Sequence, residues 1–203
     1  MPKVIDKKDK KTQILDAAIR VFAQKGASHT KISDIAEAAG IGKGTVYEYF
    51  HSKDEILTAS FHYFIEAGTS RVEQHLRALT DPLERLTAYF KAWAEMFDSD
   101  YMHYLEVILD FWAQGIRRDK KSHAIHLAEL YALYRTTLEG LLNECVAAGC
   151  IAPVDTRITA SILLGTLDGL LLQWIMDRSL FDIKEAIEFI PRLFLRGLPK
   201  EDS

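Results

Sequence analysis

Cysteine is scarce in this sequence, which holds only two, Cys145 and Cys150. A zinc site built on thiolates needs a complete set of ligands at short regular spacings, and two thiols five residues apart do not supply one. Residues 1–11 are charged and no apolar run follows them, so a secretory signal is not expected. The sequence therefore predicts free thiols, no metal site and a cytoplasmic protein.

Long apolar runs and catalytic motifs are also missing. The most apolar stretch, residues 160–176, contains Asp168 and Gln173 and is shorter than the roughly 20 residues of a typical membrane span. No glycine-rich phosphate loop, nucleophile elbow or zinc-protease motif is present. We therefore expect no membrane partner, no cofactor and no enzymatic activity.

The net charge of −4 is small and unevenly distributed. Residues 1–55 hold ten Lys or Arg against eight Asp or Glu, whereas residues 56–203 hold fifteen against twenty-one. A protein that coats nucleic acid would be basic throughout. The distribution excludes such a coat and leaves room for DNA binding by the N-terminal end alone.

Helical periodicity is what the sequence has in abundance, and no segment alternates as a strand does. The predicted fold is all-α with about nine helices, three in an N-terminal domain (residues 1–52) and six in a C-terminal body (residues 53–203). Gly26 should end the first helix, Thr30 should cap the second, and Ser52 with Glu55 forms a capping box. The helices expected outside the pair described next are 10–24, 52–79, 82–97, 101–114, 123–148, 155–177 and 182–197, with Asp81, Asp155 and Asp182 as caps.

Residues 32–50, ISDIAEAAGIGKGTVYEYF, predict two short helices joined by a tight turn at Gly40, which is the layout of a helix-turn-helix DNA reader. Val46 and Phe50, four residues apart, would anchor the second helix to the core. The remaining residues would face outward, where they could touch phosphates and base edges. They are Gly42, Lys43, Gly44, Thr45, Tyr47, Glu48 and Tyr49.

Three residues are candidate phosphate ligands. The ammonium of Lys43 or Lys53 could neutralise a phosphate. Thr30, at a helix N-terminus, could offer its hydroxyl and backbone N–H. Glu48 either accepts a hydrogen bond from a cytosine amino group or simply faces solvent, and the sequence leaves both open.

About residues 10–60 resemble the DNA-binding domain of the TetR/AcrR family of bacterial transcriptional regulators. The matching residues are Thr30, Ile32, Ile35, Ala36, Ala39, Gly40, Ile41, Lys43, Gly44, Thr45, Val46, Tyr47, Tyr49, Phe50, Ser52 and Lys53. The resemblance implies DNA contacts at Thr30, Lys43, Thr45, Tyr47, Tyr49 and Lys53, with Gly44 near the bases. It also implies a homodimer formed through the last two helices and a small-molecule site in a helical body.

A row of small residues supports the dimer. Ser161, Gly165 and Gly169 recur every fourth position on one helix face, while the other faces of that helix are apolar. A helix that is apolar all round must be buried all round, and small residues let a partner helix approach closely. We predict an interface of these three residues with Phe189 and Leu193, the alternative being a central helix of a monomer core.

Aromatic residues gather in the middle helices. Tyr and Trp combine an apolar body with a polar group, which suits a ligand pocket, although hydrophobic core is the alternative for each residue. The predicted ligand-binding residues are Trp93, Phe97, Tyr104, Phe111, Trp112, Tyr131 and Tyr134, with His103, Asp110 and Gln114 as orienting groups. Asp168 could be paired across the dimer or reach this pocket, and the sequence does not decide between these roles.

Together these observations predict a cytoplasmic, homodimeric regulator that binds a double-stranded DNA operator. Most simply it is a repressor, released from a palindromic operator when a hydrophobic or aromatic small molecule shifts its conformational population. One alternative is a DNA-binding regulator whose body meets a protein instead of a small molecule. Another is an all-helical enzyme that carries such a helix pair by coincidence.

Overall fold

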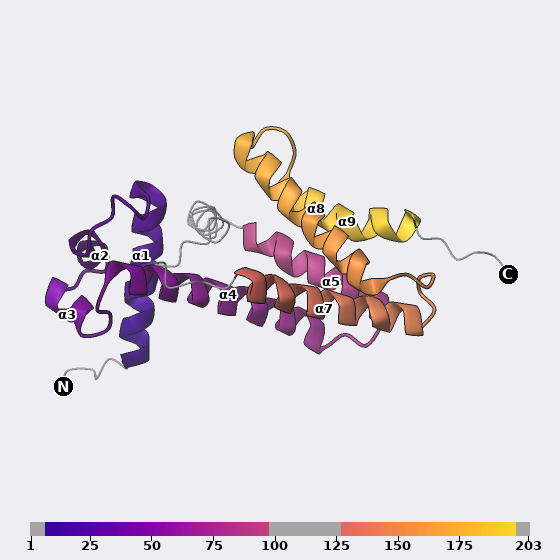
Figure 1. Cartoon of the computed structure of the whole chain (residues 1–203), viewed down its shortest axis with the longest axis horizontal. Helices are drawn as coiled ribbons and strands as arrows, with labels where there is room; N and C mark the ends of the chain where they lie inside the picture. The colour runs from indigo at the N-terminus through magenta and orange to yellow at the C-terminus, as the bar shows by residue number, and fades with distance from the viewer. Residues whose placement is uncertain (1–6, 98–126, 198–203) are drawn as a thin grey trace. The chain divides into compact units, whose positions relative to one another are not determined.

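The computed structural model describes residues 7–97 and 127–197, and every regular element within these ranges is a helix, as the all-α prediction requires (Figure 1). The elements are α1 (Lys7–Lys25), α2 (Ile32–Ala38), α3 (Lys43–Tyr47), α4 (Lys53–Arg77), α5 (Pro82–Ala94), the 3-10 turn η1 (Glu95–Phe97), α7 (Leu127–Ala147), α8 (Thr156–Met176) and α9 (Ile183–Gly197). The helix predicted for residues 101–114 lies outside the described residues.

The described chain divides into two compact units. The reader unit holds residues 7–67, and the body unit holds residues 68–97 and 128–197. The division falls between Ala67 and Gly68, inside α4, so this helix contributes to both units. The predicted domain boundary between residues 52 and 53 stays a prediction.

The reader unit is built on a short helical core. α1 packs on α2, and α2 packs on α3. The predicted anchors of the second reader helix, Val46 and Phe50, are 0% and 1% exposed. The other side chains at most 1% exposed in this unit include Ile14, Ile19, Phe22, Ile35 and Ile56, whose helical spacing places them on one face of each helix.

In the body unit, α5 packs on α9, and α9 packs on α8. Ile183, Ile187 and Ile190 of α9 recur at intervals of three and four residues and are all buried, so one face of this helix joins the core. The largest fully buried side chains of the unit are Leu86, Tyr89, Phe90, Leu138 and Leu142. Both cysteines are free, as predicted, and burial raises the pKa of the Cys145 thiol to about 11.

Most predicted helix caps are present. Asp81, Asp155 and Asp182 each accept a hydrogen bond from the backbone N–H three residues later, at 2.8–3.0 Å. Ser52 Oγ likewise accepts from Glu55 N at 3.1 Å, while the Glu55 carboxylate accepts from the backbone N–H of His51 at 2.7 Å. These contacts satisfy backbone donors that the first turn of a helix leaves without a partner.

The predicted cap of the second helix was wrong. Lys31, not Thr30, is the N-cap of α2, with extended backbone angles of φ −108° and ψ 154°. The Thr30 hydroxyl turns back and donates to the Gly26 carbonyl oxygen at 2.8 Å. The backbone N–H of Lys31 donates to the carboxylate of Asp34 at 2.9 Å, and the N–H of Asp34 donates to the carbonyl oxygen of Lys31 at 3.0 Å.

The helix α8 is longer than the apolar stretch that the sequence showed. This helix, Thr156–Met176, has 21 residues and is long and apolar enough to cross a membrane. The prediction that its length excludes a membrane span was therefore wrong. The central helices of many folded proteins pass the same test, which makes this weak evidence. Half-buried Asp168 near its middle is costly to place in hydrocarbon.

Candidate DNA-reading surface and aromatic cluster

The turn between α2 and α3 depends on one glycine. Gly40 has φ +64°, a left-handed conformation that costs other residues energy. Its N–H donates to Glu37 O at 3.0 Å, and the N–H of Ile41 donates to Ala36 O at 3.0 Å. This pair of bonds is the Schellman arrangement, which ends α2 and reverses the chain toward α3.

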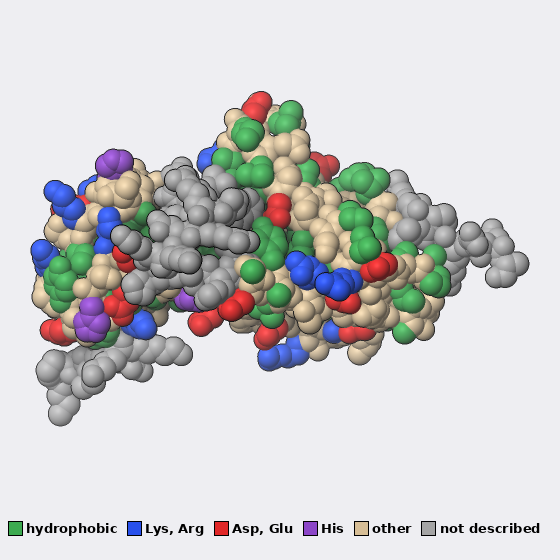
Figure 2. All heavy atoms as spheres, viewed as in Figure 1, with side chains coloured by type: hydrophobic (Ala, Val, Ile, Leu, Met, Phe, Trp, Pro, Cys, Tyr) green, Lys and Arg blue, Asp and Glu red, His purple; other side chains and the backbone are tan. Residues whose placement is uncertain are grey.

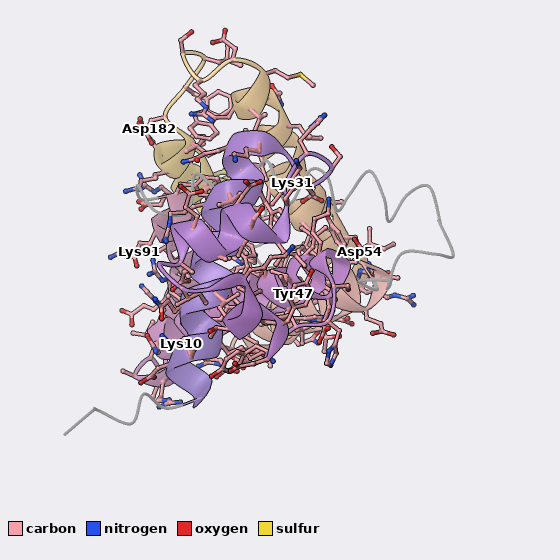
Figure 3. The ribbon with its side chains drawn as sticks, turned by 90° about the vertical axis from the view of Figure 1, so that its left-hand side faces the viewer. Lys10, Lys31, Tyr47, Asp54, Lys91 and Asp182 are labelled. Atoms are coloured by element: carbon pink, nitrogen blue, oxygen red, sulfur yellow. The ribbon has the colours of Figure 1, made fainter. Side chains whose placement is uncertain are left out.

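The second reader helix presents the predicted residues outward. Lys43, Gly44 and Glu48 are exposed, Tyr47 is 44% exposed, and Thr45 and Tyr49 are half-buried. The Lys43 ammonium lies 5.8 Å from the centre of the Tyr47 ring, which steadies both side chains. Figure 3 looks onto this end of the reader unit and labels Tyr47 near the middle of it. We call Lys43, Gly44, Thr45, Tyr47 and Tyr49 the reader surface.

Thr30 and Lys53 are tied to the loop between α1 and α2. Thr30 is 2% exposed, and its hydroxyl is bound to Gly26, so the backbone N–H is the group it has left to offer a phosphate. The Lys53 ammonium donates to the carbonyl oxygens of Ala27 at 2.7 Å and Ser28 at 3.2 Å. The sequence did not indicate the two Lys53 contacts, because they join residues 26 and 25 positions apart.

Asp34 is a residue that the sequence analysis missed. Its carboxylate accepts from Lys31 N at 2.9 Å and pairs with the Lys25 ammonium at 3.2 Å. The hydrogen bond from Lys31 and then the contact with Lys25 lower the pKa of this carboxyl. An acidic residue in the first turn of a helix is a recognisable sequence signal for such a contact. Asp34 thereby connects the end of α1 to the start of α2.

In the body unit, four of the predicted ligand-binding residues are described. The Trp93 and Tyr134 rings meet edge to face with centres 5.0 Å apart, and Tyr131 donates to the Asp168 carboxylate at 2.9 Å. Phe97 packs instead on Trp174, at 6.0 Å. The other predicted residues, Tyr104, Phe111 and Trp112, lie outside the described ranges, as do His103, Asp110 and Gln114.

Tyr89 completes an aromatic cluster that we define as Tyr89, Trp93, Tyr131, Tyr134 and Asp168. Tyr89 is 1% exposed, and its ring centre lies 6.4 Å from that of Trp93. Among the described residues, neither the Tyr89 hydroxyl nor the Trp93 indole N–H makes a hydrogen bond, although both atoms are buried. Such unpaired buried donors are uncommon and call for a physical explanation.

The cluster is electrostatically unusual. Burial raises the pKa of the Asp168 carboxyl, and the hydrogen bond from Tyr131 lowers it by less. Burial also raises the pKa of all three phenols, and the Asp168 carboxylate raises them further. The nearby Trp93 indole lowers the pKa of Tyr89 by less than burial raises it, although the two side chains do not form a hydrogen bond. The tyrosines therefore stay neutral, and Asp168 is the group in this cluster that titrates.

The predicted dimer residues lie on an apolar surface of α8 and α9. Ser161 and Gly165 are exposed, and a Cβ added at Gly165 or Gly169 would meet nothing within 4 Å. Figure 2 shows hydrophobic side chains gathered over α8. The large apolar residues exposed on this surface are Ile158 (58%), Ile162 (62%), Leu172 (37%), Phe189 (47%) and Leu193 (62%). We call them, with Ser161, Gly165 and Gly169, the α8–α9 face.

The described residues hold no group of three or more His, Cys, Asp or Glu side chains that could bind a metal ion. Three sets of described residues are therefore candidates for binding: the reader surface, the aromatic cluster and the α8–α9 face.

Known proteins resemble the chain along nearly its whole length. The fatty acid metabolism regulator protein of Bacillus subtilis is 26% identical over 193 residues, covering 95% of this chain and 97% of the relative. The solved structure of FadR from Bacillus subtilis in complex with stearoyl-CoA has a TM-score of 0.71 at 24% identity, covering 93% and 99% of the two chains. A putative transcriptional regulator from Saccharomonospora viridis, in complex with choline, has a TM-score of 0.82 at 19% identity, covering 96% and 100%.

Two family models match separate parts of the chain. The model of bacterial regulatory proteins of the tetR family matches residues 14–60, which contain the reader surface. The model of the C-terminal region of BetI-type transcriptional repressors matches residues 82–198, more than half of the chain. The protein therefore belongs to the TetR family of bacterial transcriptional regulators, with a C-terminal region of the BetI type.

Proposed function

We propose that this protein is a homodimeric repressor that a small molecule releases from a palindromic operator. The observation that carries the DNA-binding part is the outward face of α3, where Lys43, Thr45 and Tyr47 surround the buried anchors Val46 and Phe50. A short helix fixed by its buried side can enter the major groove with its exposed side against bases and phosphates.

The α8–α9 face supports the homodimer. Its exposed apolar residues lie on two helices that pack on each other, and a lone protein in water would leave them hydrated at a cost in free energy. The open space over Gly165 and Gly169 allows a second helix to approach closely. Two copies of the reader surface would then contact half-sites about one helical turn of DNA apart, which accounts for a palindromic operator.

The aromatic cluster supports a small-molecule effector, as do the stearoyl-CoA and choline complexes of two structural relatives. The alternative effector is a protein partner, which would require no buried site. Release from DNA would follow if the ligand binds better to a conformation in which the reader surfaces no longer match the operator. The helix α4 is the natural element for this coupling, since it contributes residues to both units. We propose no enzymatic activity and a cytoplasmic location.

The experiment is to measure binding of the purified protein to duplex DNA from the region flanking its own gene. Tyr47→Ala should weaken binding, because it removes an exposed ring from the reader surface. Leu133→Ala is the matched control, since Leu133 is 50% exposed but lies in the body unit. Equal affinity of Tyr47→Ala and the parent for every fragment would refute the assignment of the reader surface.

A further inference from the structure

The two cysteines of the chain meet at the end of α7. Gly149 has φ +66° and its N–H donates to the Val146 carbonyl oxygen at 2.9 Å, while the N–H of Cys150 donates to the Cys145 carbonyl oxygen at 2.9 Å. This pair of bonds is the Schellman arrangement, in which the residue after the left-handed glycine commonly packs on the residue five positions earlier. Here those two residues are Cys145 and Cys150.

The backbone geometry suits a disulfide between them. The 2.9 Å hydrogen bond from Cys150 N to Cys145 O limits the separation of the two Cα atoms to about 6.8 Å, because the other bonds of this link have fixed lengths. Disulfides join Cα atoms that lie about 4.4–6.8 Å apart. The sequence holds no other cysteine, so neither thiol has a competing partner within the chain.

The two thiols differ in their surroundings. Cys145 is 0% exposed and its sulfur donates to the Pro82 carbonyl oxygen at 3.3 Å, whereas Cys150 is half-buried. Burial and then the negative charge of a Cys150 thiolate raise the pKa of the Cys145 thiol to about 11, so Cys145 stays protonated near neutral pH. An oxidant that enters from solvent therefore meets the sulfur of Cys150 first.

The Cys145 thiol lies beside the contacts that hold the end of α4. Its sulfur binds Pro82, the first residue of α5, and the neighbouring Glu144 carboxylate pairs with Arg85 at 2.8 Å. Arg85 also donates to the carbonyl oxygen of Leu76, in the last turn of α4, at 3.1 Å. Moving the Cys145 sulfur into a disulfide breaks its hydrogen bond to Pro82 and displaces the turn of α7 that carries Glu144.

We propose that Cys145 and Cys150 are a peroxide-sensitive dithiol whose oxidation weakens DNA binding. The Cys150 thiolate attacks one oxygen of hydrogen peroxide, the O–O bond breaks, and hydroxide departs to leave a sulfenic acid. The Cys145 sulfur then attacks the Cys150 sulfur, the S–O bond breaks, and the Cys145 proton departs with the hydroxyl group as water. Counting the proton that Cys150 released, two thiols are oxidised to one disulfide and one peroxide is reduced to two waters.

This inference goes beyond the proposed function, because it adds a redox signal to the small-molecule effector, and its effect on DNA rests on that function. Disulfides in cytoplasmic proteins are usually transient and redox-sensing, which agrees with the proposed location. The signal reaches the end of α4 through the contacts of Pro82, Glu144 and Arg85, and α4 contributes residues to both units.

The first test counts free thiols in the full-length protein before and after treatment with hydrogen peroxide. N-ethylmaleimide added after denaturation labels every free thiol, and mass spectrometry of the intact chain gives the number of labels. We expect two labels on the reduced parent, none after peroxide, and two again after dithiothreitol. A non-reducing gel should show the oxidised protein as a single chain, because the disulfide is internal.

The second test measures affinity for duplex DNA from the region flanking the gene. Peroxide should lower the affinity of the parent at least about fivefold, and dithiothreitol should restore it. Dithiothreitol does not reduce methionine sulfoxide, so the restoration separates the disulfide from methionine oxidation. Cys150→Ser is the matched variant, because it replaces the half-buried sulfur and leaves the buried Cys145 in place. It should keep the affinity of the reduced parent after the same treatment.

Four results would overturn the proposal. They are two labels remaining after peroxide, a disulfide that links two chains, an equal affinity of the oxidised and reduced parent, and an equal loss of affinity in Cys150→Ser. Failure of the reduced parent to bind any fragment would overturn the proposed function and with it the effect on DNA, while the thiol count still decides whether the disulfide forms.

Discussion

The α8–α9 face can be tested by placing a charge at its most exposed positions, and Ile162→Asp is the sharpest such change. Ile162 is 62% exposed in the single chain, so the substitution removes little from the fold of the body unit. In the proposed dimer the same residue is buried against a partner helix. The variant should therefore weaken association while leaving the folded chain intact.

The expected loss of dimer stability follows from the exposed fraction of the Ile162 side chain. Full burial of an Ile side chain stabilises by about 1.5–3 kcal/mol, so burying the 62% that is exposed contributes about 1–2 kcal/mol per copy. Two-fold symmetry places the change in both chains, which gives about 2–4 kcal/mol and a dissociation constant raised at least about 30-fold. Desolvating the new carboxylate adds to this value.

Sedimentation equilibrium over a range of protein concentrations measures the dissociation constant directly. Leu133→Asp is the control, because Leu133 is 50% exposed on α7 and outside the α8–α9 face. Its dissociation constant should match that of the parent. The reasoning fails if the two variants dissociate equally, if Ile162→Asp behaves as the parent does, or if the parent is already a monomer at micromolar concentration.

Three further predictions concern the reader unit. Lys53→Ala should make the salt dependence of DNA binding shallower by about one unit, whereas Lys91→Ala in the body unit should not; an unchanged slope for Lys53→Ala would mean that this ammonium serves the loop and not a phosphate. Gly40→Ala should destabilise the reader unit by about 1–2 kcal/mol, because alanine is strained at a φ of +64°. An added Cβ would meet no atom within 4 Å, so no steric clash contributes. An unchanged thermal unfolding temperature would contradict this prediction. The pKa of Asp34 is lowered by folding, so its stabilisation is present above its unfolded pKa and is lost as the pH falls through its folded pKa. Asp34→Asn should therefore flatten acid unfolding in that window, and an identical acid profile would count against the contact.

Local sequence features were sufficient for much of the reader unit and for helix caps in the body unit. The burial of Val46 and Phe50, the positive φ of Gly40 and the caps at Asp81 and Asp155 depend on residues within about one helical turn, so spacing alone predicts them. The prediction that Thr30 caps α2 was wrong. Thr30 and Lys31 are adjacent, and two separate contacts set their roles: the Thr30 hydroxyl donates to the carbonyl oxygen of Gly26, and the Lys31 N–H donates to the carboxylate of Asp34.

The sequence by itself determined the all-α class, the reader helices and the family, because helical period and turn residues are properties of neighbouring positions. Only the tertiary structure decided which aromatic residues meet and what surrounds Asp168, since Tyr131 and Asp168 are 37 positions apart. The same holds for Lys53, whose ammonium reaches loop carbonyls 25 and 26 positions earlier. Such contacts arise from how helices pack, and packing depends on the shapes of all the side chains between them rather than on any local pattern.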